Sequence, residues 1–221
     1  MHIASYTAPS GQEELALTFG DPSASMRLLV LPAWFDEANK LRHFTVEVLR
    51  RLEREGVASV MPDLPGCNES LAPLAAQDLA SWRGAARAAS QAYGCTHVLA
   101  IRAGVNLAPD LPGWAFAPLA GKAALRALLR ARVVAAKEAN RSESSEALLE
   151  TGKGEGLALG GYHLGAGMVT ALAEAELPAH GLHTLTPADF GAAGLWLRAE
   201  PDHDAAQAEA LAVRVVQDLG G

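Results

Sequence analysis

Short apolar runs alternate with longer stretches of helical periodicity along the whole chain, and this alternation constrains the fold more than any other feature. Two of the runs, Arg27–Leu31 and His97–Ile101, are almost continuously apolar, which is typical of parallel strands buried on both faces. Six more runs have strand character, at 15–19, 57–61, 114–118, 157–162, 182–185 and 195–199. The alternation predicts a three-layer α/β fold in which helices cover both faces of a mostly parallel sheet.

The segments between these runs carry the spacing of amphipathic helices. Residues 40–55 place Leu41, Phe44, Val48 and Leu52 three and four positions apart, so that one face is apolar. Three further helices are predicted over 74–93, 122–139 and 204–219. The stretch 120–156 also holds two polar, glycine-containing segments, so we expect a lid or insertion there. The chain as a whole, 1–221, is expected to be a single domain.

The charge balance excludes one class of partner. The chain has 18 basic and 25 acidic residues, a net charge of −7, which argues against a nucleic-acid-binding surface. The cations of the predicted helix 122–139 could approach an anionic membrane. We interpret them as a solvated helix face instead, because acidic residues follow directly in the sequence.

The two cysteines and the hydropathy of the chain argue against a disulfide framework, a metal site and a membrane span. Cys67 and Cys95 cannot form a disulfide framework and match no metal-ligand spacing, so neither a metal nor a cofactor is expected. The first residues lack the pattern of a signal peptide, and no stretch reaches the roughly 18 apolar residues of a membrane span. We therefore expect a cytoplasmic protein without a transmembrane segment.

Two loops fall at the carboxyl ends of predicted strands, where open α/β sheets bind their ligands. The first covers residues 32–40 and includes Trp34 and Glu37. The second, 62–70, follows the pattern D-x-x-G-x-G-x-S, with Asn68 in place of the second glycine. This replacement is mild, because asparagine tolerates left-handed backbone angles. Asp63 and Ser70 are expected to bind backbone groups of the loop, an architectural role.

The next strand leads to a segment that aligns with the G-x-S-x-G nucleophile elbow of α/β hydrolases. The closing glycine is present as Gly104, but Arg102 occupies the position of the serine. A guanidinium stays protonated and cannot act as an acyl-transfer nucleophile, although it can bind an anion by a bidentate fork. Residues 105–113 contain two prolines, so the helix that should follow the elbow is expected to be reduced to about one turn.

Together these segments resemble one family, the hydrolase-like proteins encoded beside exosortase A in bacterial exopolysaccharide clusters. The first loop is similar to the family pattern P-P-F-x-E-E-x-N-K-x-R at Phe35, Glu37, Asn39, Lys40 and Arg42. The later turn is similar to D-L-P-G-x-G-x-S, and one branch of the family has arginine at the position of Arg102. Further similarity lies at 121–129 and 158–164, so the resemblance covers about residues 28–176. It implies an α/β-hydrolase fold and an accessory role in exopolysaccharide biosynthesis or export.

The candidate site residues each have an alternative interpretation. Arg102 either recognises an anion or a partner, or forms a structural ion pair with Glu37, whose loop should face the elbow. Arg102, Trp34 and Glu37 form the predicted ligand-binding set. Cys67 is a weak catalytic candidate, because the sequence assures no base beside it. His203 is another, since the histidine of a hydrolase triad comes last in the chain, but its acidic neighbours also suit a helix start.

The predicted function is that of a degenerate α/β-hydrolase-fold protein that binds a small anionic ligand or a protein partner. An active esterase or thioesterase with an unidentified nucleophile is the first alternative, and a structural interaction module is the second. Whether the chain is an enzyme stays open, because the fold suggests a hydrolase and Arg102 removes its usual nucleophile.

Overall fold

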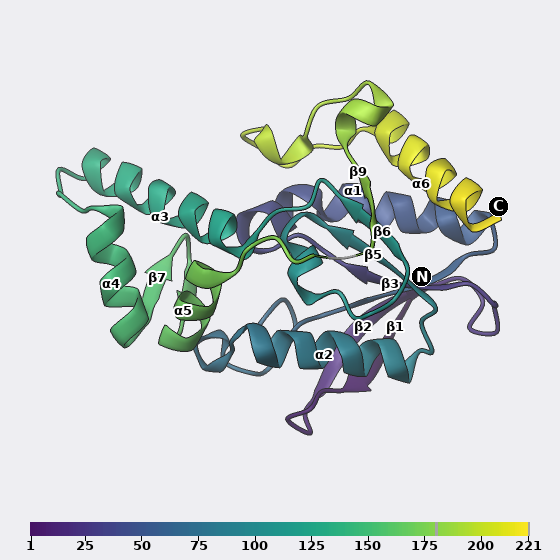
Figure 1. Cartoon of the computed structure of the whole chain (residues 1–221), viewed down its shortest axis with the longest axis horizontal. Helices are drawn as coiled ribbons and strands as arrows, with labels where there is room; N and C mark the ends of the chain where they lie inside the picture. Colours follow the sequence, from purple (N-terminus) through teal and green to yellow (C-terminus); the bar gives the residue numbers. More distant parts are fainter. Residues whose placement is uncertain (180, 221) are drawn as a thin grey trace.

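The computed structural model describes residues 1–179 and 181–220, and within them a seven-stranded sheet forms the middle layer (Figure 1). The strand order is β1-β2-β4-β3-β5-β6-β9. Strands β3 to β6 and β9 run parallel, whereas β1 and β2 are antiparallel at one edge. The strands are β1 His2–Thr7, β2 Glu13–Phe19, β3 Arg27–Leu31, β4 Ala58–Pro62, β5 His97–Ile101, β6 Gly113–Phe116 and β9 His183–Leu185.

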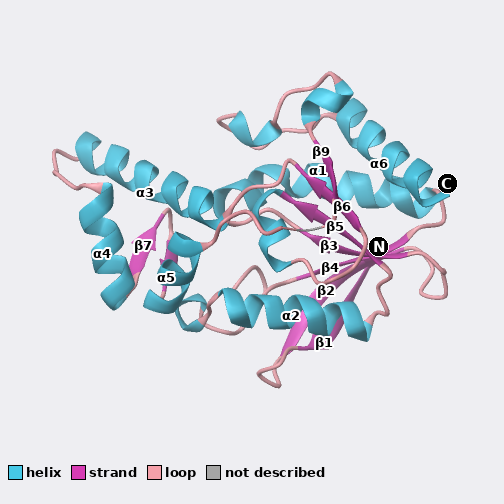
Figure 2. Ribbon diagram, in the orientation of Figure 1, coloured by secondary structure: helices cyan, strands magenta, loops and turns pink. Residues whose placement is uncertain are grey.

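Helices cover both faces of this sheet (Figure 2). Helices α1 (Phe35–Arg54) and α6 (Ala205–Gly220) pack on one face, where Leu28 and Val30 of β3 point. Helix α2 (Leu79–Ala92) packs on the other, against Leu29 and Leu31. The near-continuous apolar run of β3 therefore fills two cores at once, as a strand covered on both faces must. The predicted three-layer α/β fold with a mostly parallel sheet is confirmed.

The strands at Arg27–Leu31 and His97–Ile101 lie where the sequence predicts them, and β4 and β6 differ from prediction by one or two residues. Two strand predictions were wrong. The run 157–162 is not one strand but the hairpin of β7 (Leu157–Leu159) and β8 (Tyr162–Leu164), because Gly160 and Gly161 both have positive φ and turn the chain. The run 195–199 contains the short 3-10 helix η4 (Leu195–Leu197), which buries Leu195 rather than joining the sheet.

A second group of elements extends from one end of the sheet (Figure 1). Helix α3 (Gly121–Glu138) packs with α4 (Ser145–Glu155) and α5 (Ala166–Glu174), and the β7–β8 hairpin lies among them. Helices α4 and α5 were not predicted, since both are short and rich in glycine and alanine. The group is therefore larger than the predicted segment 120–156, and its action as a lid stays a prediction.

Candidate functional site

The carboxyl edge of the sheet concentrates unusual backbone angles. In the loops after β3, β4, β5 and β6, four residues other than glycine have positive φ: Phe35, Asn68, Arg102 and Ala117, at 55°, 49°, 54° and 46°. Such angles cost of order 1–3 kcal/mol for residues other than glycine or asparagine, and they cluster where a site needs a fixed geometry. This edge is also where open α/β sheets bind ligands, so it is the candidate site.

Arg102 directly follows β5 and begins the 3-10 helix η2 (Arg102–Leu107), so the helix after the elbow is reduced as predicted. Its Nε and Nη2 donate to the two carboxylate oxygens of Glu37 at 2.9 and 2.8 Å. Its Nη1 donates to the carbonyl oxygen of Ala117 at 2.9 Å, and its Cζ lies 3.9 Å from the ring centroid of Trp196. Arg102 is only 8% exposed. Every side of the guanidinium is thus engaged, which is the ion-pair arrangement that the sequence left as one alternative.

Local structure explains why these two side chains meet. Helix α1 begins at Phe35, so Glu37 lies in its first turn, where a carboxylate also favours the helix dipole. Gly104 allows η2 to lie against β3: a Cβ at this position would be 2.4 Å from the carbonyl oxygen of Leu31. The closing glycine of the elbow pattern is therefore a packing requirement, independent of any serine before it.

A cavity of about 130 Å³ lies beside the pair, between the loop after β3 and the loop after β4. Its walls come from the loop after β3 with the start of α1, from β4 and the turn after it, from α2 and from the β7–β8 hairpin. The lining residues with polar or aromatic side chains are Trp34, Phe35, Asn39, Arg42, Thr45, Cys67, Asn68, Trp82 and Tyr162. Arg102 and Glu37 are not among the lining residues, so the ion pair and the cavity are neighbours rather than one site.

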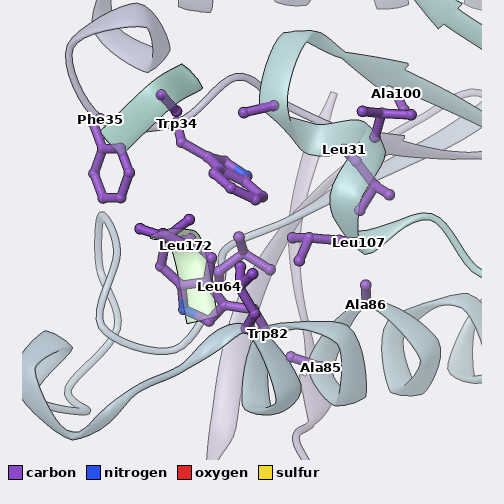
Figure 3. Packing of buried hydrophobic residues seen from close by; sticks show 14 of the residues in the cluster. Leu31, Trp34, Phe35, Leu64, Trp82, Ala85, Ala86, Ala100, Leu107 and Leu172 are labelled. Carbon is purple, nitrogen blue, oxygen red and sulfur yellow. The ribbon is translucent and has the colours of Figure 1, made fainter. Parts of the chain in front are cut away.

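Figure 3 shows Trp34, Phe35 and Trp82 close together among the buried hydrophobic side chains, and all three also line the cavity. Trp34 meets Trp82 edge to face, with ring centroids 5.3 Å apart, and Phe35 meets Tyr162 in the same way at 5.2 Å. The Trp82 Nε1 donates to the carbonyl oxygen of Pro65 at 2.9 Å. The Trp34 Nε1 is buried and has no hydrogen-bond partner in the described part of the chain. An unsatisfied buried donor costs about 1–3 kcal/mol, so this N–H is suited to an acceptor that a ligand supplies.

In the turn after β4, Ser70 binds a backbone group of the loop as predicted, whereas the Asp63 carboxylate accepts a hydrogen bond from the side chain of Asn68. The Ser70 hydroxyl accepts from the backbone N–H of Gly66 at 2.8 Å, and the Asn68 amide donates to the Asp63 carboxylate at 2.6 Å. The Tyr6 hydroxyl donates to the backbone carbonyl of Asp63 at 2.7 Å. Burial raises the pKa of Asp63, while the Asn68 hydrogen bond and the charge of Arg42 oppose that rise. These contacts fix the floor of the cavity.

In the described residues, no hydrogen bond links the Cys67 thiol or the His203 ring to another side chain. Burial raises the pKa of Cys67 to about 12, so its thiol stays protonated at neutral pH. His203 stacks on His43 of α1, with ring centroids 4.3 Å apart, and within residues 1–179 and 181–220 its Nδ1 has no partner. The Asp204 carboxylate accepts from the backbone N–H of Gln207 at 2.9 Å, as a residue that starts a helix does. No hydrogen bond in the described residues joins Cys67 or His203 to Arg102.

Sequence reasoning missed Trp196 and Trp82, which complete the surroundings of Arg102 and Trp34. The chain has only four tryptophans, and that scarcity was the available signal. In the described residues, no three His, Cys, Asp or Glu side chains come together in a way that could hold a metal ion. No described helix is both long enough and apolar enough to cross a membrane.

Comparison with known proteins adds only distant structural similarity. No protein-family model matches the chain, and no curated protein matches it in sequence. An epoxide hydrolase from Vigna radiata is 18% identical with a TM-score of 0.37, over 45% of this chain and 30% of that one. A putative α/β hydrolase from Agrobacterium tumefaciens is 11% identical with a TM-score of 0.42, over 53% and 60%. A putative aryl esterase from Burkholderia cenocepacia is 16% identical with a TM-score of 0.42, over 53% and 47%.

Proposed function

We propose that the chain is a non-catalytic, cytoplasmic binding protein on an α/β-hydrolase-like fold, with an accessory role in exopolysaccharide biosynthesis or export. The exopolysaccharide link rests on the resemblance of about residues 28–176 to the family encoded beside exosortase A. The absence of serine-hydrolase chemistry rests on one observation: both carboxylate oxygens of Glu37 accept hydrogen bonds from Arg102 at the elbow. That pair occupies the position where an acyl-transfer nucleophile and its substrate carbonyl would meet.

The ligand we propose is small and has an anionic or acceptor group on an apolar body. The cavity has mostly apolar and aromatic walls, which suit the body of such a ligand. Arg42 is exposed at its wall and forms no ion pair in the described chain, so it is available to an anion. Trp34 lines the same cavity, and its Nε1, although buried, has no partner in the described chain. In this proposal Arg102 and Glu37 fix the loop that carries Trp34, rather than contacting the ligand.

Nuclear magnetic resonance tests the proposal through the indole N–H signals of the four tryptophans. Butyrate serves as a small anionic probe, and a Trp34→Phe variant assigns the Trp34 signal. We expect butyrate to shift the Trp34 signal saturably and to leave that of Trp114 unchanged, because the Trp114 Nε1 already donates to Asp218 at 2.8 Å.

Arg42→Gln should weaken butyrate binding by about tenfold, the effect of losing one charge-assisted hydrogen bond. Arg54→Gln is the matched control, since Arg54 is exposed in the last turn of the same helix. No saturable shift at Trp34, or equal affinity in the Arg42 variant and the wild type, would contradict the proposal.

One observation favours the alternative function, an active esterase or thioesterase: Cys67 lines the cavity. Its raised pKa and the lack of a contacting base argue against a thiolate nucleophile. Turnover of p-nitrophenyl butyrate that disappears in Cys67→Ala would favour this alternative. The structural interaction module would bind neither butyrate nor ester.

A further inference from the structure

A second cavity lies at the opposite, amino-terminal edge of the parallel strands. It is a groove of about 760 Å³ between the carboxyl end of α2 and strands β1, β2 and β4. Helix α2 runs beside the β1–β2 hairpin (Figure 1), and the Tyr93 hydroxyl donates to the Ser5 carbonyl at 2.7 Å, which ties the two together. The apolar part of the lining includes Ala4, Ala58, Val60 and Ala92. This groove shares no lining residue with the cavity beside α1.

Arg27 brings a positive charge into this groove without a counter-charge. Arg27 is the first residue of β3, and alternate residues of a strand point to the same face of the sheet. Leu29 and Leu31 pack on the α2 side, so the Arg27 side chain points to that side as well. Its guanidinium lies under Gly94, where a Cβ would be 3.2 Å from Nη2.

In the described residues, one hydrogen bond of the Arg27 guanidinium is found, from Nη1 to the Pro22 carbonyl at 3.3 Å. Its Nε is buried without a partner, and it forms no ion pair. Arg27 is half-buried, and a guanidinium without an ion-pair partner is suited to charge-assisted hydrogen bonds with an anion.

The carboxylates nearest in the chain to this groove are already engaged. The Asp21 side chain accepts from the backbone N–H and the hydroxyl of Ser23 at 2.8 and 2.7 Å. The Glu53 carboxylate accepts from the backbone N–H of Gly20 at 2.9 Å and pairs with the N-terminal ammonium. The chain has a net charge of −7, yet Arg27 lies in this groove without an ion-pair partner among the described residues.

We propose that this groove is a second binding site, which takes an amphipathic monoanion with an unbranched apolar chain, its head group on Arg27. The apolar chain lies between α2 and the hairpin, over the alanines and Val60. The head group accepts from Nη2 of Arg27, which donates to no described residue. The site is independent of the cavity beside α1, so either proposal can fail alone.

Binding of octanoate and of octanol to the full chain tests this proposal. Octanoate should shift the backbone amide signals of Gly94 and Cys95, which line the groove, and octanol should bind more weakly at the same place. Arg27→Gln should weaken octanoate binding by about tenfold and leave octanol unchanged, because only the anion loses a charge-assisted contact. Arg87→Gln, an exposed arginine of α2, is the charge-matched control and should bind both probes as the wild type does.

A second variant keeps the test valid if Arg27→Gln unfolds the chain. Ala4→Phe places a ring in the groove from the edge strand β1, where phenylalanine suits a strand, and should abolish binding of both probes. The proposal is overturned if octanoate shifts only signals of the cavity beside α1. It is also overturned if octanoate binds Arg27→Gln as tightly as the wild type, or Ala4→Phe as tightly as the wild type.

Discussion

Replacement of Arg102 by alanine tests how much the Glu37 pair contributes to stability. The side chains are 10% and 23% exposed, so the variant leaves a largely buried carboxylate without its partner. Removing one member of a buried pair costs about 3–5 kcal/mol, and the partial hydration of Glu37 places this case near the lower end. The lost bond to Ala117 and the lost stacking on Trp196 add to the effect, but not additively. We expect Arg102→Ala to lower the free energy of unfolding by about 3–4 kcal/mol.

Urea unfolding followed by far-ultraviolet circular dichroism measures this loss. The urea concentration at the midpoint should fall, while the dependence of the unfolding free energy on urea concentration stays unchanged. The cycle of Arg102→Ala, Glu37→Gln and the double variant should give a coupling of about 2 kcal/mol or more. Arg102→Gly should be more stable than Arg102→Ala by about 1 kcal/mol, since φ is 54°. Arg198→Ala, which breaks an exposed pair with Asp202, is the control and should cost at most about 0.5 kcal/mol. A coupling near zero would refute the structural role of the pair.

Three further predictions concern Glu47, Cys67 and two glycines. Hydrogen bonds from two arginines of α1 lower the pKa of Glu47 from 4.5 to about 2, so its stabilisation is complete above pH 4.5 and lost as pH falls toward about 2. Glu47→Gln should therefore reduce the change of the free energy of unfolding with pH between about pH 4.5 and pH 2. Iodoacetamide at pH 8 should alkylate native Cys67 slower than the unfolded chain by roughly a hundredfold or more, and fast native alkylation would contradict the raised pKa. Gly104→Ala should destabilise by about 3 kcal/mol or more because its Cβ meets backbone, whereas Gly154→Ala, in open space, should stabilise by about 0.5–1 kcal/mol.

The parallel sheet could be predicted because strands such as β3 are apolar on both faces, and no other environment suits that pattern. Strand β1 was missed, since as an edge strand it buries only Tyr6 and its other side chains are exposed or half-buried. The Arg102–Glu37 pair was anticipated, because both lie at the carboxyl edge of adjacent strands. The stacking of Trp196 was not, because it depends on how the chain after β9 folds back as short 3-10 turns, which local periodicity does not specify.

Our central proposal is that the turn after β5 holds the Arg102–Glu37 ion pair instead of a nucleophile. Labelling with a fluorophosphonate probe, which captures activated serine nucleophiles, tests this claim most directly. The account predicts that the native chain labels no more than the heat-denatured chain, and that Arg102→Ala does not change this. Strong labelling of the native chain that one serine-to-alanine substitution abolishes would contradict it.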